Sequence, residues 1–310
     1  MAVWLLHDNY DYNDEPNYIS ATSMLRPIKQ IILAKHVIAE EKVMDVSERI
    51  SATLGNAVHD SIESVWSDPA QRSRALKMLG IPEWVRENIC VNPTPEFLAA
   101  NPNAIPIYLE YRVIKEINGF KVGAKLDSII DRKLLDVKST SVYTYLKSRK
   151  EEDHALQLSI YRWANPELID GEYGFIQFVF TDWQKFMTYT DEDYPKTRII
   201  EQPIKFLSIE ETERFITNKL SQIRDLWDKP EEELPECTDK DLWRGETVYK
   251  YFSKPENQKA TKNFDTDKSA AYAHLADKGV GVIKEVPGQV KACAYCPAYK
   301  VCKQKDQYGI

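Results

Sequence analysis

The 310-residue sequence lacks any apolar run long enough to cross a bilayer, since a spanning helix needs about 20 consecutive apolar residues. Its first residues, MAVWLLHDNYDYNDEP, also lack the basic region and the small-residue cleavage site of a secretory signal. A nucleotide-binding G-x4-G-K-[ST] loop is absent, which excludes an encoded ATPase motor. We therefore expect a cytoplasmic protein with no membrane segment.

The sequence also has no excess of positive charge. The formal net charge is −7, with 43% apolar and 29% charged residues, which is an ordinary globular composition. Because phosphates are contacted by Lys and Arg, this charge does not by itself indicate a nucleic-acid-binding protein. Carboxylates that bind divalent cations are acidic by necessity, however, and basic residues can still line one cleft. The run LKSRK (Leu146–Lys150) is a candidate for such a lining, or a solvated face.

The hydrophobic periodicity predicts an α/β fold. Residues 1–20 form an irregular segment. Helical patterns follow over 20–37, over 151–164 and over 208–228, and a further one begins near Asp45 or Ser47 and ends at Gly80. Strand patterns cover 105–119, 120–131, 133–140, 172–182 and 185–193. Two prolines and a charge run mark 228–236 as a linker. We predict one domain over 1–230 and a smaller one over 231–310.

Two neighbouring strands of this pattern carry carboxylates where a buried sheet would carry aliphatic residues. Asp127 lies near the end of one strand, and Asp136 and Lys138 lie on the next. If the strands pair antiparallel, the two aspartates converge, and they repel each other unless a cation lies between them. Hard oxygen ligands suit Mg²⁺ or Mn²⁺. The alternative is an exposed polar face with Asp–Lys ion pairs.

Two helices place further polar residues near these strands in the sequence. Gly55, His59 and Glu63 form one i, i+4 stripe of the second helix, so His59 is either a metal ligand or a half-buried histidine. Gln157 and Tyr161 form another i, i+4 pair and either contact a phosphate or base or lie exposed on the surface.

The five cysteines suit a reducing compartment better as thiols or metal ligands than as disulfides. Cys293, Cys296 and Cys302 form a C-x2-C-x5-C pattern, and Cys237 is the best candidate for a fourth ligand. Cys90 has an apolar context typical of a buried thiol, and His274 is a weaker alternative for the fourth ligand. A set of four cysteines fits either a [4Fe–4S] cluster or Zn²⁺.

The order Gly55-x3-His59-x3-Glu63, Gly123-x3-Asp127, Asp136-Val137-Lys138 and Gln157-x3-Tyr161 resembles the RecB-like branch of the PD-(D/E)XK nucleases over about 45–165. The resemblance implies a restriction-endonuclease-like α/β core, with a central mixed β-sheet flanked by helices. It implies Mg²⁺- or Mn²⁺-dependent hydrolysis of DNA, with an exonuclease favoured. One departure is that Gly123 precedes Asp127 by four positions, where the family often has three.

The resemblance also implies roles for the matching positions. His59, Asp127, Asp136 and the backbone carbonyl of Val137 would ligate the metal, and Lys138 would orient the water and stabilise charge on the phosphate. Gln157 and Tyr161 would shape the DNA-binding wall. Glu110, on the preceding strand, is either an additional metal or water ligand or a surface acid of an edge strand.

The cysteine triplet resembles that of the iron–sulfur members of the same branch, including CRISPR-associated, helicase–nuclease and phage-encoded nucleases. Those proteins usually take their first cysteine from an N-terminal helix, and the corresponding stretch MLRPIKQIIL has none. The cluster therefore stays open between [4Fe–4S] and Zn²⁺, with a structural role in either case. The resemblance places the protein in DNA replication, recombination, repair or phage DNA processing, beside a helicase, recombinase or single-strand-binding protein.

Two other functions compete with a nuclease. A catalytically silent DNA-binding or recombination accessory protein on the same fold would bind DNA in a salt-sensitive way without cleaving it. A structural protein held by a cysteine–metal site would unfold on chelation and would tolerate changes at Asp127.

Overall fold

A computed structural model describes residues 1–7, 13–37, 45–147 and 150–310. The basic run at 146–150 lies partly outside these ranges. The chain divides into two compact units, the first comprising 1–25 and 42–221 and the second 26–41 and 222–310. The predicted boundary at 230/231 stays a prediction, and we describe each unit by itself.

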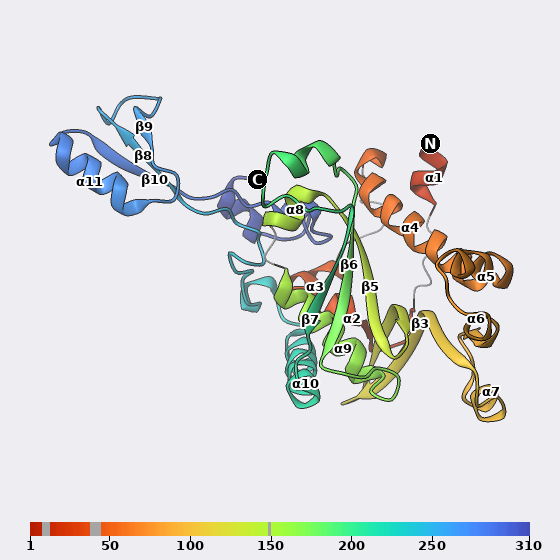
Figure 1. Ribbon diagram of the computed structural model, residues 1–310. Helices are drawn as coiled ribbons and strands as arrows, with labels where there is room; N and C mark the ends of the chain where they lie inside the picture. The colour runs from red at the N-terminus through yellow and green to blue at the C-terminus, as the bar shows by residue number, and fades with distance from the viewer. Residues whose placement is uncertain (8–12, 38–44, 148–149) are drawn as a thin grey trace. The chain divides into compact units, whose positions relative to one another are not determined.

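The first unit contains the large sheet and most of the helices (Figure 1). Its strands are β1 (Tyr18–Ser20), β2 (Ile89–Val91), β3 (Ile105–Ile117), β4 (Phe120–Ile130), β5 (Lys133–Thr140), β6 (Tyr173–Phe180) and β7 (Ile199–Lys205). Its α-helices are α1 (Ala2–Leu6), α2 (Ala21–Met24), α4 (Ile50–Ser67), α5 (Pro69–Met78), α6 (Glu83–Asn88), α7 (Pro95–Ala100), α8 (Val142–Lys147), α9 (Glu151–Ala164) and α10 (Ile209–Leu226), whose last turn extends into the second unit. Two 3₁₀ helices, η2 (Val46–Arg49) and η3 (Lys185–Tyr189), complete it.

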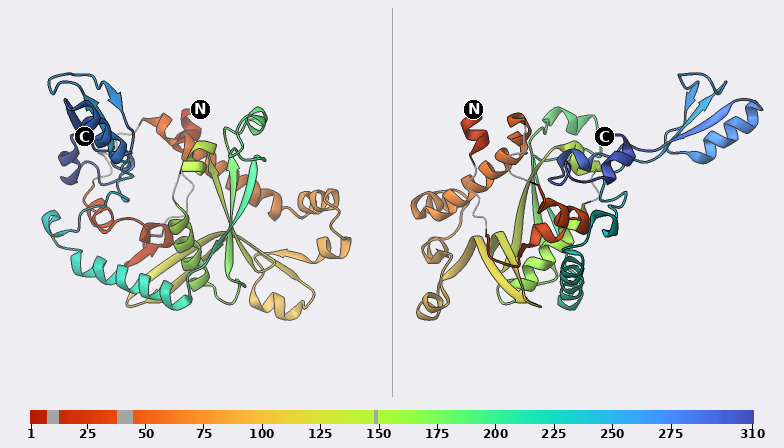
Figure 2. Two further views of the ribbon diagram at one scale, coloured as in Figure 1. Left: turned by 60° about the vertical axis from the view of Figure 1, so that its left-hand side comes forward. Right: turned by 180° about the vertical axis from the view of Figure 1, so that it is seen from behind.

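The sheet is mixed and strongly twisted (Figure 2). Its strand order is β2-β3-β4-β5-β6-β7, and β1 pairs with the beginning of β4. The pairs β1–β4, β2–β3 and β5–β6 are parallel, and the others are antiparallel. Helix α9 packs against β3, β4 and β7, and α4 packs against β5. The predicted α/β class, with a central mixed sheet flanked by helices, is confirmed.

The core lies between this sheet and α9. Its fully buried side chains include Leu126, Leu134, Leu158, Ile160, Trp163, Ile176 and Ile204. The Trp163 indole Nε1 donates to Glu213 Oε2 at 2.9 Å, so its polar end is satisfied although the ring is buried. None of the helices in the described ranges is both long and apolar enough to span a membrane.

Tight turns join the three strands that carry the predicted site. Asn118 and Gly119 both have positive φ, at 52° and 79°, as the commonest two-residue hairpin turn requires. Asp131 and Arg132 have φ of 51° and 60° and make the second turn. These two hairpins hold β3, β4 and β5 side by side.

The structure corrects three local predictions. The helix predicted over 20–37 is interrupted by Pro27, which begins a new helix because its ring cannot continue the previous one. The strand predicted at 185–193 is a 3₁₀ helix and turns, and the strand beside β6 is instead β7. Part of the predicted irregular N-terminus is helix α1.

The second unit contains the cysteine triplet and a small sheet. Its elements are α3 (Ile28–Ala34), η4 (Glu231–Glu233), β8 (Val248–Phe252), β9 (Lys262–Asn263), α11 (Lys268–Lys278), β10 (Val282–Val286), η5 (Ala292–Tyr295) and η6 (Gln304–Tyr308). The stretch predicted as a linker packs within this unit: Leu234 is buried, and Glu231 pairs with the buried Lys29 at 3.8 Å.

Candidate functional site

The predicted site lies where β4 and β5 separate. Their ladder runs only from Ile130–Lys133 to Ser128–Leu135, and β1 covers the opposite end of β4. Beyond the last pair, the Asp127 carboxylate replaces the missing backbone acceptor: Oδ2 accepts the Val137 N–H at 2.7 Å. The gap between the strands therefore contains a carboxylate that is fixed in place by one strand's backbone.

Three side chains from three elements meet at this gap. His59 of α4 lies with its Nδ1 3.5 Å from Asp127 Oδ2 of β4 and 3.6 Å from Glu110 Oε1 of β3. Each of the three residues has a ligand atom within 4.8 Å of the others. All three side chains are half-buried, so a small cation can reach them while most bulk water is excluded.

Glu110 has a strained backbone. It lies at a break in the β3–β4 register, between the pairs Leu109–Ser128 and Tyr111–Leu126. Its φ is 45°, a conformation that costs a residue other than glycine about 1–3 kcal/mol. β2 pairs with β3 only over Ile105–Ile107, and the Glu110 side chain is 19% exposed. The Lys125 ammonium lies 2.8 Å from its carboxylate. We take this strain as support for the predicted ligand role, which stays a prediction.

Asp136 lies beside this group, with a different set of partners. Its side chain is 1% exposed. Oδ2 lies 2.7 Å from the Lys138 ammonium, and Oδ1 accepts from Gln157 Nε2 at 3.3 Å. Gln157 also donates to Tyr161 Oη at 2.8 Å. The alternative of an exposed Asp–Lys face does not hold for Asp136, because a buried carboxylate needs these partners.

Gln157 and Tyr161 are both buried, at 6% and 4% exposure. The alternative that they form an exposed pair is therefore wrong. Their contact with DNA stays a prediction, and within the protein their role is to hold Asp136. The Val137 carbonyl likewise stays a predicted ligand.

Two glycines allow other chain segments to approach the site strands. A Cβ at Gly123 would lie 2.0 Å from the hydroxyl of Tyr18, so only glycine allows the Tyr18 ring to cross β4. A Cβ at Gly55 would lie 3.3 Å from Ser139 Oγ, a tight contact that is less severe than the clash at Gly123. The two glycines of the sequence motif therefore serve packing, and they bring α4 and β1 close to the strands.

The electrostatics of the group follow from burial and charge. Burial, with the nearby negative charge of Asp136, raises the pKa of Asp127 to about 7. A hydrogen bond with Glu110 raises the pKa of His59 although burial opposes it. Burial alone would raise the pKa of Glu110, but hydrogen bonds with His59 and Lys125 hold it below its ordinary value. Mutually repelling carboxylates and a histidine are a donor set that favours a bound cation.

The geometry therefore fits a divalent metal ion. A half-buried set of two carboxylates and an imidazole suits Mn²⁺, and Mg²⁺ through the carboxylates with retained waters. The neighbouring ammonium of Lys138 adds a positive charge whose pKa stays above its ordinary value: burial would lower it, but Asp136 outweighs that effect.

The site also contains a residue that the sequence prediction missed. His154 lies one turn before Gln157 on α9, and its ring lies 5.8 Å from that of Phe178, the residue opposite Lys138 in the β5–β6 register. Burial, together with the positive charge of Lys138, lowers the pKa of His154. The available signal was its i, i+3 spacing from Gln157. The lowered pKa favours the neutral form of the His154 imidazole.

Metal binding at this group should depend on pH through Asp127. Its pKa in the folded protein lies above the ordinary value of about 4, so the metal-free protein loses stability as pH rises from about 4 through 7. A cation replaces that proton and also requires neutral His59. We expect the Mn²⁺-induced rise in Tm to be small near pH 6 and to grow as the pH passes about 7.

Thermal melts with and without Mn²⁺ across this range measure the effect. The control is Asp127→Asn, which should lose most of the metal-induced rise and its pH dependence. A rise in Tm that is independent of pH, or retained in Asp127→Asn, would contradict metal binding at Asp127.

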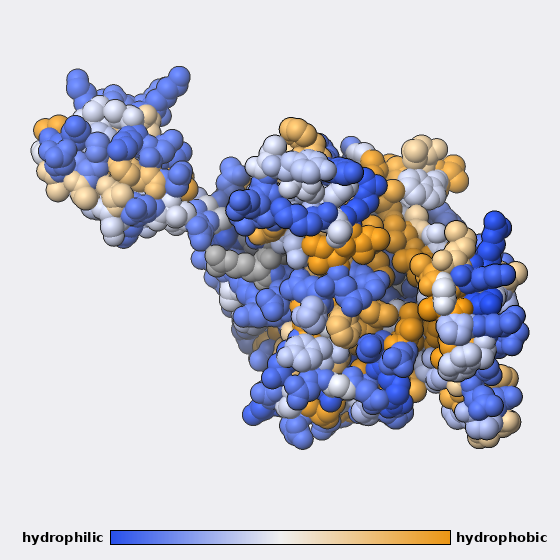
Figure 3. Space-filling view, viewed as in Figure 1, coloured by the Kyte–Doolittle hydropathy of each residue, from blue (hydrophilic) through white to orange (hydrophobic). Residues whose placement is uncertain are grey.

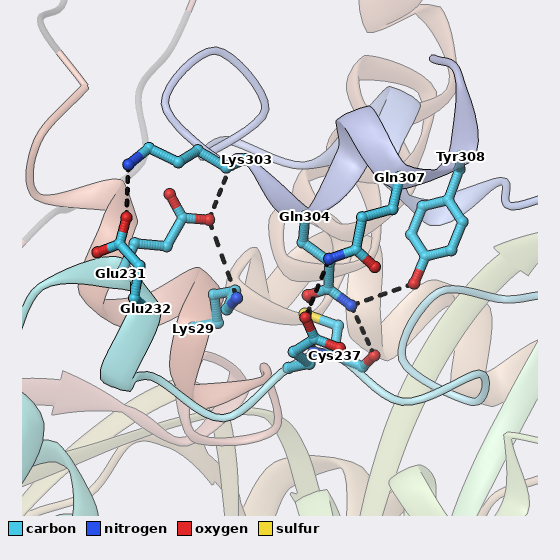
Figure 4. Close-up of polar contacts among 9 residues, drawn as sticks. Lys29, Glu231, Glu232, Cys237, Lys303, Gln304, Gln307 and Tyr308 are labelled. Carbon is cyan, nitrogen blue, oxygen red and sulfur yellow. Dashed lines mark hydrogen bonds and ion pairs between the residues drawn. The ribbon is translucent and has the colours of Figure 1, made fainter.

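Cys237 of the second unit is fixed by contacts with the C-terminal segment. Its backbone is held by the buried side chain of Gln304 (Figure 4): the Cys237 N–H donates to Oε1 at 2.9 Å, and Nε2 donates to the Cys237 carbonyl at 3.0 Å. Nearby, the Lys303 N–H donates to Glu231 at 2.7 Å. Residues far apart in the sequence therefore fix Cys237 against the segment that follows Cys302.

The thiols are close enough to affect one another. Burial raises the pKa of Cys237 to about 12, and the charges of Asp241, Cys302 and Cys296 add to the effect. Burial is also the main cause that raises the pKa of Cys296 and of Cys293, with Cys302 adding to both.

Comparisons with known proteins leave the family open. Neither a protein-family model nor a curated protein matches the sequence. One similar solved structure is that of the protein SSO0001. It is 21% identical to this chain, the match covers 71% of this chain and 81% of that one, and the TM-score is 0.40. Another is that of a phage-related exonuclease from Haemophilus somnus 129PT. It is 13% identical, the match covers 68% of this chain and 94% of that one, and the TM-score is 0.29. TM-scores this low do not assign a function to this chain.

Proposed function

We propose that the chain is a Mg²⁺- or Mn²⁺-dependent DNA nuclease that acts as an exonuclease. The observation that carries the proposal is the His59–Glu110–Asp127 group beside the buried Asp136–Lys138 pair. A structural ion pair alone needs no such group, because three mutually close ligand atoms beside a second buried carboxylate are costly without a cation.

Each residue has a role that its contacts support. A divalent cation held by His59, Glu110 and Asp127 would lower the pKa of a water and offset charge on a phosphate. The Lys138 ammonium is held by Asp136, so it is pre-oriented to hydrogen-bond the attacked phosphate and stabilise the negative charge that develops there. Gln157 holds the second oxygen of Asp136, and thereby limits the rotation of its carboxylate.

Purified protein incubated with end-labelled DNA and Mn²⁺ or Mg²⁺ tests the proposal. We expect cleavage that requires the cation and stops on chelation, with mononucleotides released from one end. A closed circular DNA should resist it if the mode is exonucleolytic. Salt-sensitive DNA binding with no cleavage under any divalent cation would replace this proposal with the catalytically silent alternative.

We propose further that Cys237, Cys293, Cys296 and Cys302 bind a structural metal centre. Two observations support it: the clamp of Gln304 on Cys237 and the mutual proximity of the thiols. We propose a [4Fe–4S] cluster, with Zn²⁺ as the alternative, because a set of four cysteines suits both. The DNA process and the partner, whether a helicase, a recombinase or a single-strand-binding protein, belong to the same proposal.

A further inference from the structure

The segment between Cys237 and Cys293 contains a small lobe, residues 248–286, in which α11 packs on a three-stranded antiparallel sheet (Figure 1). The lobe has buried side chains of its own in Tyr251, Phe252 and Ala271. The ring of Tyr251 lies edge-on to that of His274 on α11, with centroids 4.9 Å apart. The lobe contributes no residue to either site described above.

The strand register divides the side chains of this sheet between two faces. Side chains alternate along a strand, so Tyr249 and Tyr251 face α11, as do their cross-strand partners Glu285 and Ile283. Glu285 confirms this direction, because Lys268 and Tyr272 of α11 both contact its carboxylate. The opposite face contains the other residues of these strands, Val248, Lys250, Phe252, Val282, Lys284 and Val286.

That opposite face contains a cross-strand pair of like charges. Lys250 and Lys284 are direct partners in the β8–β10 register, and Asn263 lies opposite Lys250 on β9. Like charges directly opposite each other destabilise a sheet, and neighbouring strands are about 4.8 Å apart. Within these three described strands, no carboxylate shares this face. An anion bound to both lysines would remove this repulsion.

The lobe as a whole is positively charged, like the lysine pair on this face. It holds seven lysines and five carboxylates, within a chain of net charge −7. Figure 3 shows hydrophilic side chains over most of the part of the lobe that is in view. Lys284 also covers the ring of Phe252, with Nζ 4.4 Å from its centroid, and donates to the Pro255 carbonyl at 3.0 Å. This arrangement places its ammonium over the face.

We infer that the face of the β8–β10 sheet opposite α11 binds the phosphate backbone of DNA through Lys250 and Lys284. The inference rests on the proposed function, because DNA is the polyanion that a nuclease must hold. A membrane surface fits the face less well, since its exposed apolar side chains are valines and lack the Trp, Phe or Leu of interfacial anchors. Phosphate contacts of this kind bind without reading sequence.

The test is equilibrium binding of the full chain to a labelled duplex in EDTA, which prevents cleavage, at several salt concentrations. The variant is Lys250→Gln/Lys284→Gln. We expect its Kd to rise about tenfold at low salt. The slope of log K against log salt should decrease by about 2, because each phosphate that a lysine neutralises contributes about 0.9 to that slope. The matched control is Lys268→Gln/Lys278→Gln, which removes the same charge from α11 and should leave both values near those of the wild type.

The inference is overturned if the lysine-pair variant keeps the wild-type slope, or if the control changes it equally. Loss of binding to anionic vesicles with unchanged DNA binding would also overturn it and identify a membrane surface instead. Metal-dependent cleavage of a short oligonucleotide, measured in parallel, separates the two proposals. Cleavage with an unchanged salt slope defeats only this inference, and a reduced slope in a protein that never cleaves defeats only the proposed function.

Discussion

Lys138→Ala should lower the rate of cation-dependent DNA cleavage by about 10²–10³-fold, the usual effect of removing one hydrogen-bond donor aimed at a developing negative charge. The ammonium lies 2.7 Å from the buried Asp136, so the variant lacks a group whose position is fixed in advance. Single-turnover cleavage at saturating protein is the appropriate measurement, because it excludes changes in affinity. The matched control is Lys133→Ala, on the same strand with a largely exposed side chain.

The variant also leaves the Asp136 carboxylate buried without its cation, which is destabilising. A second variant, Asp136→Asn/Lys138→Ala, removes both charges and avoids this cost. We expect it to fold, as near-native circular dichroism and Tm would show, and to be inactive. Wild-type cleavage by either folded variant would exclude Lys138 from the chemistry.

The second large effect is expected in the second unit. Cys296→Ser should abolish metal binding by the cysteines and lower the stability of that unit by on the order of 5 kcal/mol, since a structural metal contributes directly to folding. Elemental analysis and visible absorbance of protein purified without oxygen measure the metal and its type, and protease sensitivity measures the local unfolding. A brown, iron-containing protein supports [4Fe–4S], and a colourless zinc-containing one supports Zn²⁺.

Cys90→Ser provides the matched control. Cys90 lies on β2 in the first unit, where its thiol contacts the Ile105 carbonyl at 3.7 Å, so its replacement should leave the metal content unchanged. Equal metal content in Cys296→Ser and the wild type would contradict the cysteine site.

Helices and turns that are determined by residues close together in the sequence could be predicted. The hairpin at Asn118–Gly119 was predictable, because asparagine and glycine are the residues that best tolerate the positive φ of its turn. Helix α10 was predictable from its capping box: Ser208 Oγ accepts the Glu211 N–H, and the Glu211 carboxylate accepts the Ser208 N–H. The lobe at 248–286 was not predicted, because its strands are short and the β8–β10 pairing joins residues about thirty or more positions apart.

The site shows the same division. Asp127, Asp136, Lys138 and His59 were identified from their order and spacing, and they come together in the first unit. The backbone strain at Glu110, by contrast, depends on the break in the β3–β4 register, which the sequence does not display. The burial of Gln157 and Tyr161 depends on how α9 packs against the sheet. This packing places Gln157 within hydrogen-bonding distance of Asp136 and of Tyr161.

The sequence by itself determined the α/β class, the three hairpin strands and the residue types able to bind a cation, since turns and periodicity are local properties. Only the tertiary structure decided which of those residues meet. The β4–β5 ladder ends at Ser128–Leu135, and the gap beyond it exists because strand separation, helix packing and register act over long sequence distances. Two of the three aspartates in the stretch GAKLDSIIDRKLLDVKST therefore have different partners: Asp127 lies with His59 and Glu110, and Asp136 holds Lys138.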